Sequence, residues 1–593
     1  MTEPTKKLMS GNEAIARGAY EYGIRVAAAY PGTPSTEILE NIAQYKNTIY
    51  SEWSPNEKVA LEVAIGAAIG GARSLAAMKH VGLNVALDPL MTIAYSGVNA
   101  GLVVISADDP GMHSSQNEQD NRFLAKFAKI PLLEPSDSQE AKDMIGIALE
   151  VSEQFDTPVL MRTTTRISHS ASLVTVNDPL NIPVKPYIKA ADKYVMVPAH
   201  AKKRRLIVEQ RLEDLQQYSE TTPLNHITIN DKKVGVITSG VAYQYVLEAL
   251  PNASILKIGF SNPLPKNMIK QFAEQVEQLF VVEELEPFME EQISAMGIKV
   301  IGKELLPNIG ELSVQIIRQI IGGETIANLE AAATVATQLT TEQAPLRPPV
   351  LCPGCPHRGV FFVLKKLKLV VSGDIGCYTL GALAPLSAMD TAVCMGQSIG
   401  GAHGMELANP SLKGKTVAVI GDSTFLHTGI NGLMDVVYNG GHTTTLILDN
   451  RITAMTGQQH NPSSGQTLMG NPAHEIDIEL LCKAIGINRV YKAKPFELKE
   501  LELLIKQELA IDAPSVIIVQ HPCIFVDKHK YQPVMINSNC TVCTSCMRIG
   551  CPAIVRKEDT IKINQTLCFG CDLCIQLCHF NAIEKCASKN GGL

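Results

Sequence analysis

The chain has 593 residues, a length that predicts three to five domains of ordinary size. Hydrophobic residues make up 46% and charged residues 19%, a composition that excludes a disordered protein. The formal net charge of −7 disfavours nucleic-acid binding. The sequence has no run of about 18 uncharged apolar residues and no signal peptide. We therefore expect no membrane span and a location in the reducing cytoplasm.

Helical and strand patterns alternate along most of the chain, which predicts a multidomain α/β protein with parallel sheets covered by helices on both faces. In chain order we expect a doubly wound parallel-sheet domain over 1–185, a helical connection over 186–230, a middle α/β domain over 231–325, a linker over 326–350, a second doubly wound domain over 351–532, and a short cysteine-rich domain over 533–593.

The segment 1–185 has two polar residues next to predicted helices. A turn centred on Thr33 follows a short apolar strand, and Glu57 opens a helix of small residues. A single glutamate at a helix start is common, because the helix dipole favours it there. Glu62, five residues later, is an alternative carboxyl on the same helix.

The second doubly wound segment has a metal-binding pattern. A buried strand runs into Gly421, Asp422 and Ser423, and 28 residues after Asp422 the next strand ends at Asn450. Polar groups at the carboxyl ends of parallel strands meet at one edge of a sheet, and carboxylate and amide oxygens suit Mg²⁺ beside phosphates. The pattern resembles the thiamine diphosphate motif, with Ser423 where glycine is commoner. The resemblance implies that Asp422, Asn450 and the carbonyl of Ile452 hold Mg²⁺ against the diphosphate.

Thiamine also needs a carboxyl beside its aminopyrimidine ring, in surroundings that favour the neutral acid. The helix that begins at Glu57 resembles the pyrimidine-binding domain of thiamine enzymes, so we expect Glu57 to be this catalytic group, with Glu62 as the alternative. Gly396 and Ser398 begin another predicted helix. Their segment either places backbone amides near the diphosphate or is a plain packing turn.

Fifteen cysteines are present, and eight of them form two motifs near the C-terminus. Three cysteines at two-residue intervals suit a [4Fe–4S] cluster, and the fourth of each run ligates the other cluster in two-cluster ferredoxins. Two structural zinc sites are the alternative, although zinc would not need this cross-paired repeat. We therefore expect one cluster on Cys540, Cys543, Cys546 and Cys578, and a second on Cys568, Cys571, Cys574 and Cys551.

Together the thiamine motif, the Glu57 helix and the ferredoxin-like segment resemble the 2-oxoacid:ferredoxin oxidoreductases over essentially the whole chain. The turn from Tyr30 to Ser35 matches a turn of that family, which implies that Thr33 lies beside the substrate. The nearest resemblance is to the alpha subunits of the indolepyruvate branch. It implies a smaller beta subunit in a heterodimer or a dimer of heterodimers, coenzyme A as acyl acceptor, and ferredoxin as electron acceptor.

The same resemblance implies a third [4Fe–4S] cluster near thiamine, on Cys352, Cys355, Cys377 and Cys523. The alternative is that the first two lie in a Pro-Gly turn and all four are free thiols, which leaves two clusters. The remaining cysteines, Cys394, Cys482 and Cys586, fit no ligand pattern and are interpreted as packing residues.

Met455 stands where related pyruvate enzymes have an asparagine near the substrate. A soft apolar side chain favours an aromatic substrate, so we expect oxidative decarboxylation of indolepyruvate and other arylpyruvates. His113 is either an active-site group or, more in keeping with its position in a loop, a histidine whose ring nitrogens have local hydrogen-bond partners. Alternatives to this function are an enzyme of the same family acting on another 2-oxo acid, a non-oxidative thiamine decarboxylase, and an electron-transfer module on an inactive scaffold.

Overall fold

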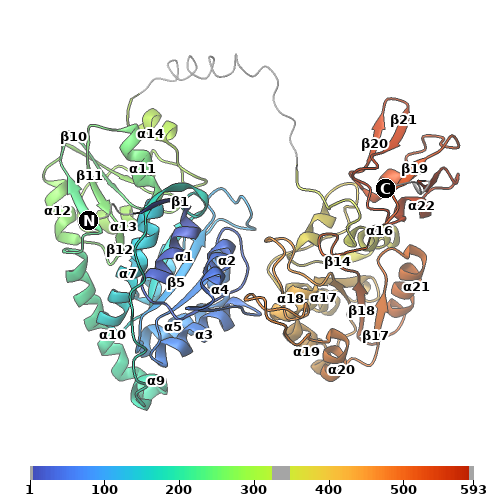
Figure 1. Ribbon diagram of the computed structural model, residues 1–593, viewed down its shortest axis with the longest axis horizontal. Helices are drawn as coiled ribbons and strands as arrows, with labels where there is room; N and C mark the ends of the chain where they lie inside the picture. Colours follow the sequence, from blue (N-terminus) through green and yellow to red (C-terminus); the bar gives the residue numbers. More distant parts are fainter. Residues whose placement is uncertain (1–4, 324–347, 530, 587–593) are drawn as a thin grey trace. The chain divides into compact units, whose positions relative to one another are not determined.

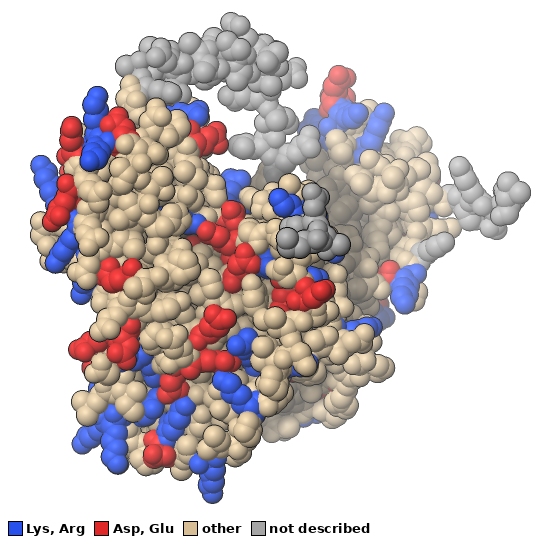
Figure 2. Space-filling model, turned by 60° about the vertical axis from the view of Figure 1, so that its left-hand side comes forward, with Lys and Arg blue, Asp and Glu red and all other residues tan. Residues whose placement is uncertain are grey.

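The computed structural model describes residues 5–323, 348–529 and 531–586, and it divides into two compact units, residues 1–344 and 345–593 (Figure 1). Almost all of the linker expected over 326–350 lies outside the described residues. On the face shown in Figure 2, acidic and basic side chains are interspersed, in keeping with the small net charge. No described helix combines the length and the apolarity needed to cross a membrane.

The first unit is built on a seven-stranded sheet with the order β12-β6-β7-β5-β4-β2-β3, parallel except for its edge strand β12. Its strands are β2 (Val26–Ala29), β3 (Tyr50–Trp53), β4 (Ser74–Lys79), β5 (Leu102–Asp108), β6 (Leu132–Leu133), β7 (Val159–Thr164) and β12 (Phe260–Asn262). All seven residues of β5 are buried, as expected for a central parallel strand with both faces covered.

Helices lie between these strands and cover the sheet. They are α1 (Gly11–Glu21), α2 (Thr36–Ile42), α3 (Glu57–Ile69), α4 (His80–Val85), α5 (Leu87–Ser96), α6 (Arg122–Ala128), α7 (Ser138–Phe155) and α8 (Thr165–His169). A separate antiparallel ribbon joins β1 (Lys6–Ser10) to β8 (Ala171–Thr175). The expected doubly wound α/β arrangement is therefore confirmed for this segment.

A four-stranded sheet of order β13-β10-β11-β9 completes the first unit. After α9 (Ala191–Tyr194) and α10 (Pro198–Ser219) come β9 (Asn225–Thr228), β10 (Asp231–Thr238), α11 (Gly240–Ala249), β11 (Ala253–Ile258), α12 (Lys266–Ala273), β13 (Gln278–Val282), α13 (Phe288–Ser294) and α14 (Val314–Ile320). Strand β9 enters this sheet from the segment expected to be a connection. Because β12 pairs with β6, one hydrophobic core continues from Leu160 of the first sheet to Ile237 and Leu256 of this one.

A buried ion-pair network joins the two sheets of this unit. Arg122 is 1% exposed and donates to Asp120 at 2.5 Å, to Glu283 at 2.6 Å and to the carbonyl of Glu284 at 2.8 Å. The Glu284 carboxyl itself is 5% exposed and accepts from the backbone N–H of Leu312 at 3.0 Å. Burial raises the pKa of Glu284 to about 7, against the opposing effects of this hydrogen bond and of the nearby arginines.

The second unit contains a five-stranded parallel sheet of order β14-β15-β16-β18-β17, followed by the cysteine-rich segment. Its main elements are α16 (His357–Leu367), β14 (Val370–Ser372), α17 (Gln397–Ala408), β15 (Thr416–Gly421), α18 (Asp422–Thr424), α19 (Ile430–Tyr438), β16 (Thr444–Asp449), α20 (Ile478–Ile485), β17 (Val490–Ala493), α21 (Leu498–Leu509) and β18 (Ser515–Gln520).

The cysteine-rich segment folds as two small antiparallel pairs with short helical turns. Its elements are β19 (Val534–Ile536), a 3₁₀ turn (Ser545–Ile549), β20 (Ile554–Lys557), β21 (Thr560–Ile563), α22 (Leu573–Gln576) and β22 (Ile583–Lys585). Its apolar residues Val534, Ile549 and Leu573 belong to the same core as Phe361 and Val419 of the parallel-sheet domain. The segment is therefore packed onto that domain.

We predict that Glu284→Gln changes how stability depends on pH. The folded-state pKa of about 7 lies above the ordinary value of 4.5, so the folded chain keeps a proton that the unfolded chain releases between these values. The free energy of unfolding of the wild type therefore falls as pH rises through this window. Glutamine keeps an acceptor for Leu312, and we expect it to stabilise the chain above pH 7 by up to about 3 kcal/mol.

Denaturation midpoints at about pH 5 and about pH 8 measure this difference, with the exposed Glu304→Gln as control. The gain should shrink toward zero at the lower pH. An equal gain at both pH values would contradict a titrating, neutral Glu284.

Candidate functional site

Thr33 and Glu57 lie at the same edge of the seven-stranded sheet. Thr33 follows β2 and Glu57 follows β3, and these two strands are parallel neighbours. Strand β4, on the other side of β2, ends at Lys79. Since open α/β sheets bind ligands at the carboxyl ends of their strands, the structure gathers the expected catalytic residues of this unit where a ligand would bind.

Glu57 is the first residue of α3, and its side chain is almost fully buried at 5% exposure. Asn56 caps the helix by accepting from the N–H of Val59 at 2.9 Å. Glycine at position 82 of α4 leaves room for the carboxyl: a Cβ there would lie 2.6 Å from Glu57 Oε1 and 2.7 Å from its Cγ. Glu62 is 45% exposed and pairs with a lysine on the same helix, so its position suits a buried catalytic group less well.

The turn at Thr33 is held by the loop that follows β5. Ser114 donates its hydroxyl to the Thr33 carbonyl at 3.2 Å, and its own carbonyl accepts from Lys79 Nζ at 2.6 Å. Burial lowers the pKa of Lys79 to about 8, with Asp109 opposing the shift. His113 in this loop is 48% exposed and lies 3.2 Å from Glu311, which agrees with a satisfied loop histidine.

In the second unit, Asp422 and Asn450 follow the neighbouring strands β15 and β16 and lie at one sheet edge. Asp422 is 2% exposed, and its Oδ2 accepts from Asn461 Nδ2 and Ser463 Oγ, both at 3.1 Å. Burial raises the pKa of Asp422 to about 7, and the neighbouring Asp449 carboxylate adds to the shift.

The remaining expected magnesium ligands surround the same edge. Asn450 is 7% exposed, and its side-chain oxygen accepts from the N–H of Ile452 at 3.3 Å. Thr453 donates to the hydroxyl of Ser423 at 2.9 Å, which joins the two motif segments. Two carboxylates buried close together disfavour each other's charge, and a divalent cation would offset that cost. The donor set therefore fits Mg²⁺.

Gly396 and Ser398 open α17, as expected, but their amides already have a partner. Both N–H groups donate to the buried carboxylate of Asp374, at 2.8 and 2.9 Å. Asp374 lies just beyond β14 at 0% exposure, and burial raises its pKa. A diphosphate at this helix start would have to share these amides with Asp374. The structure thus adds Asp374, Asn461 and Ser463 to the site, and no spacing pattern in the sequence pointed to them.

The four cysteines of the expected third cluster come from three segments of the second unit. Cys377 follows β14, and Cys523 follows β18 with its N–H donating to the Asn450 carbonyl at 3.0 Å. Cys352 and Cys355 form a turn just before α16, in which the Cys355 N–H donates to the Cys352 carbonyl at 3.1 Å. Burial raises the pKa of Cys355 to about 12, and Cys377 and Cys352 add to the shift.

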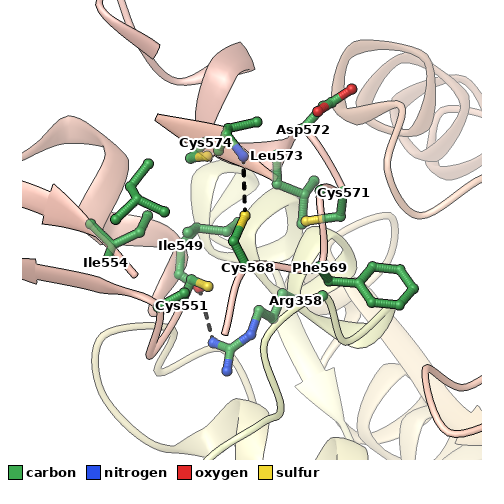
Figure 3. A pocket seen from close by; sticks show the side chains of 15 residues that line it. Arg358, Ile549, Cys551, Ile554, Cys568, Phe569, Cys571, Asp572, Leu573 and Cys574 are labelled. Atoms are coloured by element: carbon green, nitrogen blue, oxygen red, sulfur yellow. Dashed lines mark hydrogen bonds between the residues drawn. The ribbon is translucent and has the colours of Figure 1, made fainter. Parts of the chain in front are cut away.

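The two cysteine sets of the C-terminal segment surround two separate cavities. Cys551, Cys568, Cys571 and Cys574 line the first, which we call the Cys568 cavity (Figure 3). Cys540, Cys543, Cys546 and Cys578 line the second, which we call the Cys540 cavity. Each cavity thus gathers the four cysteines expected to hold one cluster, including the cross-paired fourth ligand. Cavities walled by four thiols fit [4Fe–4S] clusters.

Among the described residues, no three His, Cys, Asp or Glu side chains come close enough to hold a single metal ion. Cys482 is buried and packs in the core as expected, whereas Cys394 is exposed, so its interpretation as a packing residue is wrong. Met455 is 50% exposed in the loop after Ile452.

Each of the two units contains a segment that matches a known protein family. Residues 17–229 match the family described as "Pyruvate flavodoxin/ferredoxin oxidoreductase, thiamine diP-bdg", and residues 374–519 match "Thiamine pyrophosphate enzyme, C-terminal TPP binding domain". A solved 2-oxoglutarate:ferredoxin oxidoreductase from Magnetococcus marinus aligns with 55% of this chain and 66% of its own, with a TM-score of 0.47 and 17% identity.

Relatives match at higher identity over the whole length. The indolepyruvate oxidoreductase subunit IorA of Pyrococcus horikoshii is 40% identical, over 98% of this chain and 97% of its own. The IorA of Archaeoglobus fulgidus is 38% identical over 99% of both, and that of Methanothermobacter thermautotrophicus is 40% identical over 98% of both. The resemblance inferred from the motifs is thereby confirmed: the chain belongs to the family of IorA subunits of the indolepyruvate oxidoreductases.

Proposed function

We propose that the chain is the thiamine-dependent catalytic subunit of an indolepyruvate:ferredoxin oxidoreductase in the cytoplasm. Its relatives are named indolepyruvate oxidoreductase subunit IorA, and one structural observation supports the electron-transfer half of the reaction. The Cys568 and Cys540 cavities belong to a segment that shares a core with the domain carrying Asp422 and Asn450. An enzyme that released an aldehyde without transferring electrons would not need this exit route.

The proposed reaction balances in atoms and electrons. A 2-oxo acid anion and the thiol of coenzyme A give an acyl thioester, CO₂, a proton and two electrons. The C–C bond to the carboxylate breaks, the C–S bond forms, and the thiol releases the proton. The electrons leave one at a time to ferredoxin. Thiamine diphosphate, when bound, supplies the electron sink for CO₂ loss.

The residues of this chain would bind and orient that cofactor. Asp422, Asn450 and the Ile452 carbonyl would hold Mg²⁺ and the diphosphate, and Glu57 would exchange a proton with the aminopyrimidine. Thr33 would lie by the substrate, in the turn that Ser114 fixes.

The cysteine sets would hold the redox centres. The eight cysteines of the two cavities would carry two [4Fe–4S] clusters, and Cys352, Cys355, Cys377 and Cys523 a third. The bond from the Cys523 N–H to the Asn450 carbonyl supports the third site, because it joins that set directly to the proposed magnesium loop.

Two partners complete the proposed enzyme, a smaller beta subunit and ferredoxin. The substrate proposal depends on the names of the relatives and on Met455, whose half-exposed apolar side chain suits an aromatic ring. An anaerobic assay with and without the small subunit tests the whole proposal. We expect reduction of a low-potential dye only when an arylpyruvate and coenzyme A are both present.

Aldehyde release without dye reduction would indicate a non-oxidative decarboxylase instead. Comparable turnover of pyruvate and indolepyruvate would overturn the substrate proposal.

We expect Glu57→Gln to lower turnover by at least about 100-fold, since the variant cannot exchange the required proton. Glu62→Gln on the same helix removes an exposed carboxyl and should keep turnover near the wild type. Steady-state kinetics with a dye acceptor measure both. A larger loss in Glu62→Gln would show that the alternative carboxyl is the catalytic one.

Gly82→Ala should reduce turnover through displacement of Glu57, because its Cβ would lie 2.6 Å from the carboxyl oxygen. A displacement of this kind costs about 100-fold in kcat. Gly66→Ala is the matched control, since an added Cβ there meets nothing within 4 Å. If both variants kept full turnover, the position assigned to the Glu57 carboxyl would be wrong.

Cys571→Ser should remove about four irons per chain, because it takes one ligand from the Cys568 cavity. Cys482→Ser, buried outside every expected ligand set, should keep the full iron content. Iron analysis of anaerobically purified protein distinguishes them. About twelve irons in the wild type would support three clusters, and about eight would exclude the third.

A further inference from the structure

Arg358 is a buried cation beside the Cys568 cavity. It is the second residue of α16, is 2% exposed, and lies three residues after Cys355. Its side chain lines the cavity together with the four cysteines, and Figure 3 shows its guanidinium beside Cys551, with a hydrogen bond to the carbonyl of Ile549. The guanidinium therefore lies in the wall of the cavity where a cluster would be bound.

The hydrogen bonds of Arg358 all go to backbone carbonyls, on two segments far apart in sequence. Its Nε donates to Cys352 at 3.0 Å, and its Nη2 donates to Leu351. Its Nη1 donates to Ile549 at 3.3 Å and to Gly550, the residue before Cys551. One rigid side chain thus joins the Cys352–Cys355 turn to the loop that carries Cys551.

No carboxylate among the described residues forms an ion pair with Arg358. Burial lowers the pKa of Arg358, and the nearby side chains of Cys551, Cys355, Cys352 and Cys571 oppose this shift. A buried charge is poorly screened by solvent and salt, so its effect on these groups is strong. Arg358 therefore brings a buried positive charge to the wall of the Cys568 cavity.

The two cysteine loops also touch directly. A Cβ at Gly354, between Cys352 and Cys355, would lie 2.3 Å from Cβ of Phe569. Gly354 and Phe569 both line the Cys568 cavity. The residues lining the Cys540 cavity, by contrast, include neither lysine nor arginine. The lining of the Cys568 cavity also includes Asp572, but its carboxylate pairs with Lys585 at 2.9 Å. The Cys568 cavity therefore has charged residues in its wall, Arg358 among them, and the Cys540 cavity has none.

We propose that Arg358 is a positioning residue that raises the reduction potential of the cluster bound by Cys551, Cys568, Cys571 and Cys574. This inference rests on the proposed function, because it requires bound clusters. When that cluster accepts one electron from substrate oxidation, its negative charge grows by one, and a fixed cation nearby stabilises the added charge. When the electron leaves for the next acceptor, the original charge returns. Net charge and hydrogen bonding near a cluster are the usual determinants of its potential.

The test is a redox titration of the full-length chain, purified anaerobically and followed by electron paramagnetic resonance. Arg358→Met should move one midpoint potential to a more negative value by about 59 mV or more, a tenfold change in the equilibrium for one electron. The signal that shifts should be the one missing from Cys571→Ser. Arg358→Lys keeps the charge and should remain near the wild type.

Arg548→Met is the control for loss of a cation near the same segment. Arg548 is exposed, and its guanidinium lies over the Phe362 ring at 5.8 Å, so solvent screens its charge. We expect no shift in this variant. An Arg358→Met protein with wild-type iron content and unshifted potentials would overturn the proposal and leave Arg358 a purely structural role.

If Arg358→Met fails to assemble its iron, the midpoint potentials of Arg358→Gln and Arg358→Lys are compared instead. A more negative potential in the glutamine variant supports the proposal, and equal potentials overturn it. A wild-type chain without cubane iron would overturn the proposed function as well, and iron analysis reveals this before any potential is measured. The two failures are therefore distinguishable.

Discussion

The site depends on one geometric constraint: parallel strands deliver their carboxyl ends to the same edge of a sheet. In the first unit β2 and β3 bring Thr33 and Glu57 to one edge. In the second unit β15 and β16 do the same for Asp422 and Asn450. Strands β14 and β18 lead to Cys377 and Cys523 at that second edge, since each cysteine lies within five residues of the end of its strand. Groups tens of residues apart become neighbours because the sheet is parallel.

The same edges concentrate buried charge, which is costly unless it is partnered. Asp422 has Asn461 and Ser463 as donors, and Asp374 has the amides at the start of α17. The raised pKa values of these two carboxyls show that the donors only partly offset the loss of water. A site that holds acids in this state is suited to a divalent cation, which supplies the missing charge.

The cysteine-rich segment depends on packing against the preceding domain. It has too few apolar residues for a core of its own, and its Val534, Ile549 and Leu573 complete the core of the preceding domain. Arg358 strengthens that junction by bonding to carbonyls on both sides of it. The packing places Arg358 and Asp572 in the wall of the Cys568 cavity and no charged side chain in that of the Cys540 cavity, so two similar cysteine motifs acquire different electrostatic surroundings.

The sequence by itself determined the α/β class, the family, and the grouping of cysteines, because each follows from short-range order. Strand–helix alternation is a local pattern, and cluster ligands recur at spacings set by a tight loop. The helix that begins at Glu57 was predictable for the same reason: the small residues and the Asn56 cap lie within a few positions of it.

Only the tertiary structure decided which side chains surround those motifs. Strand β12 leaves its own domain to pair with β6, and Gly82 makes room for the Glu57 carboxyl. Asp374 accepts hydrogen bonds from the backbone N–H groups at the start of α17, which the sequence suggested as a diphosphate site. Arg358 lines a cavity whose cysteines lie about 200 residues later in the chain. Contacts between residues so distant in sequence are set by packing and charge in three dimensions, and neither leaves a spacing pattern along the chain.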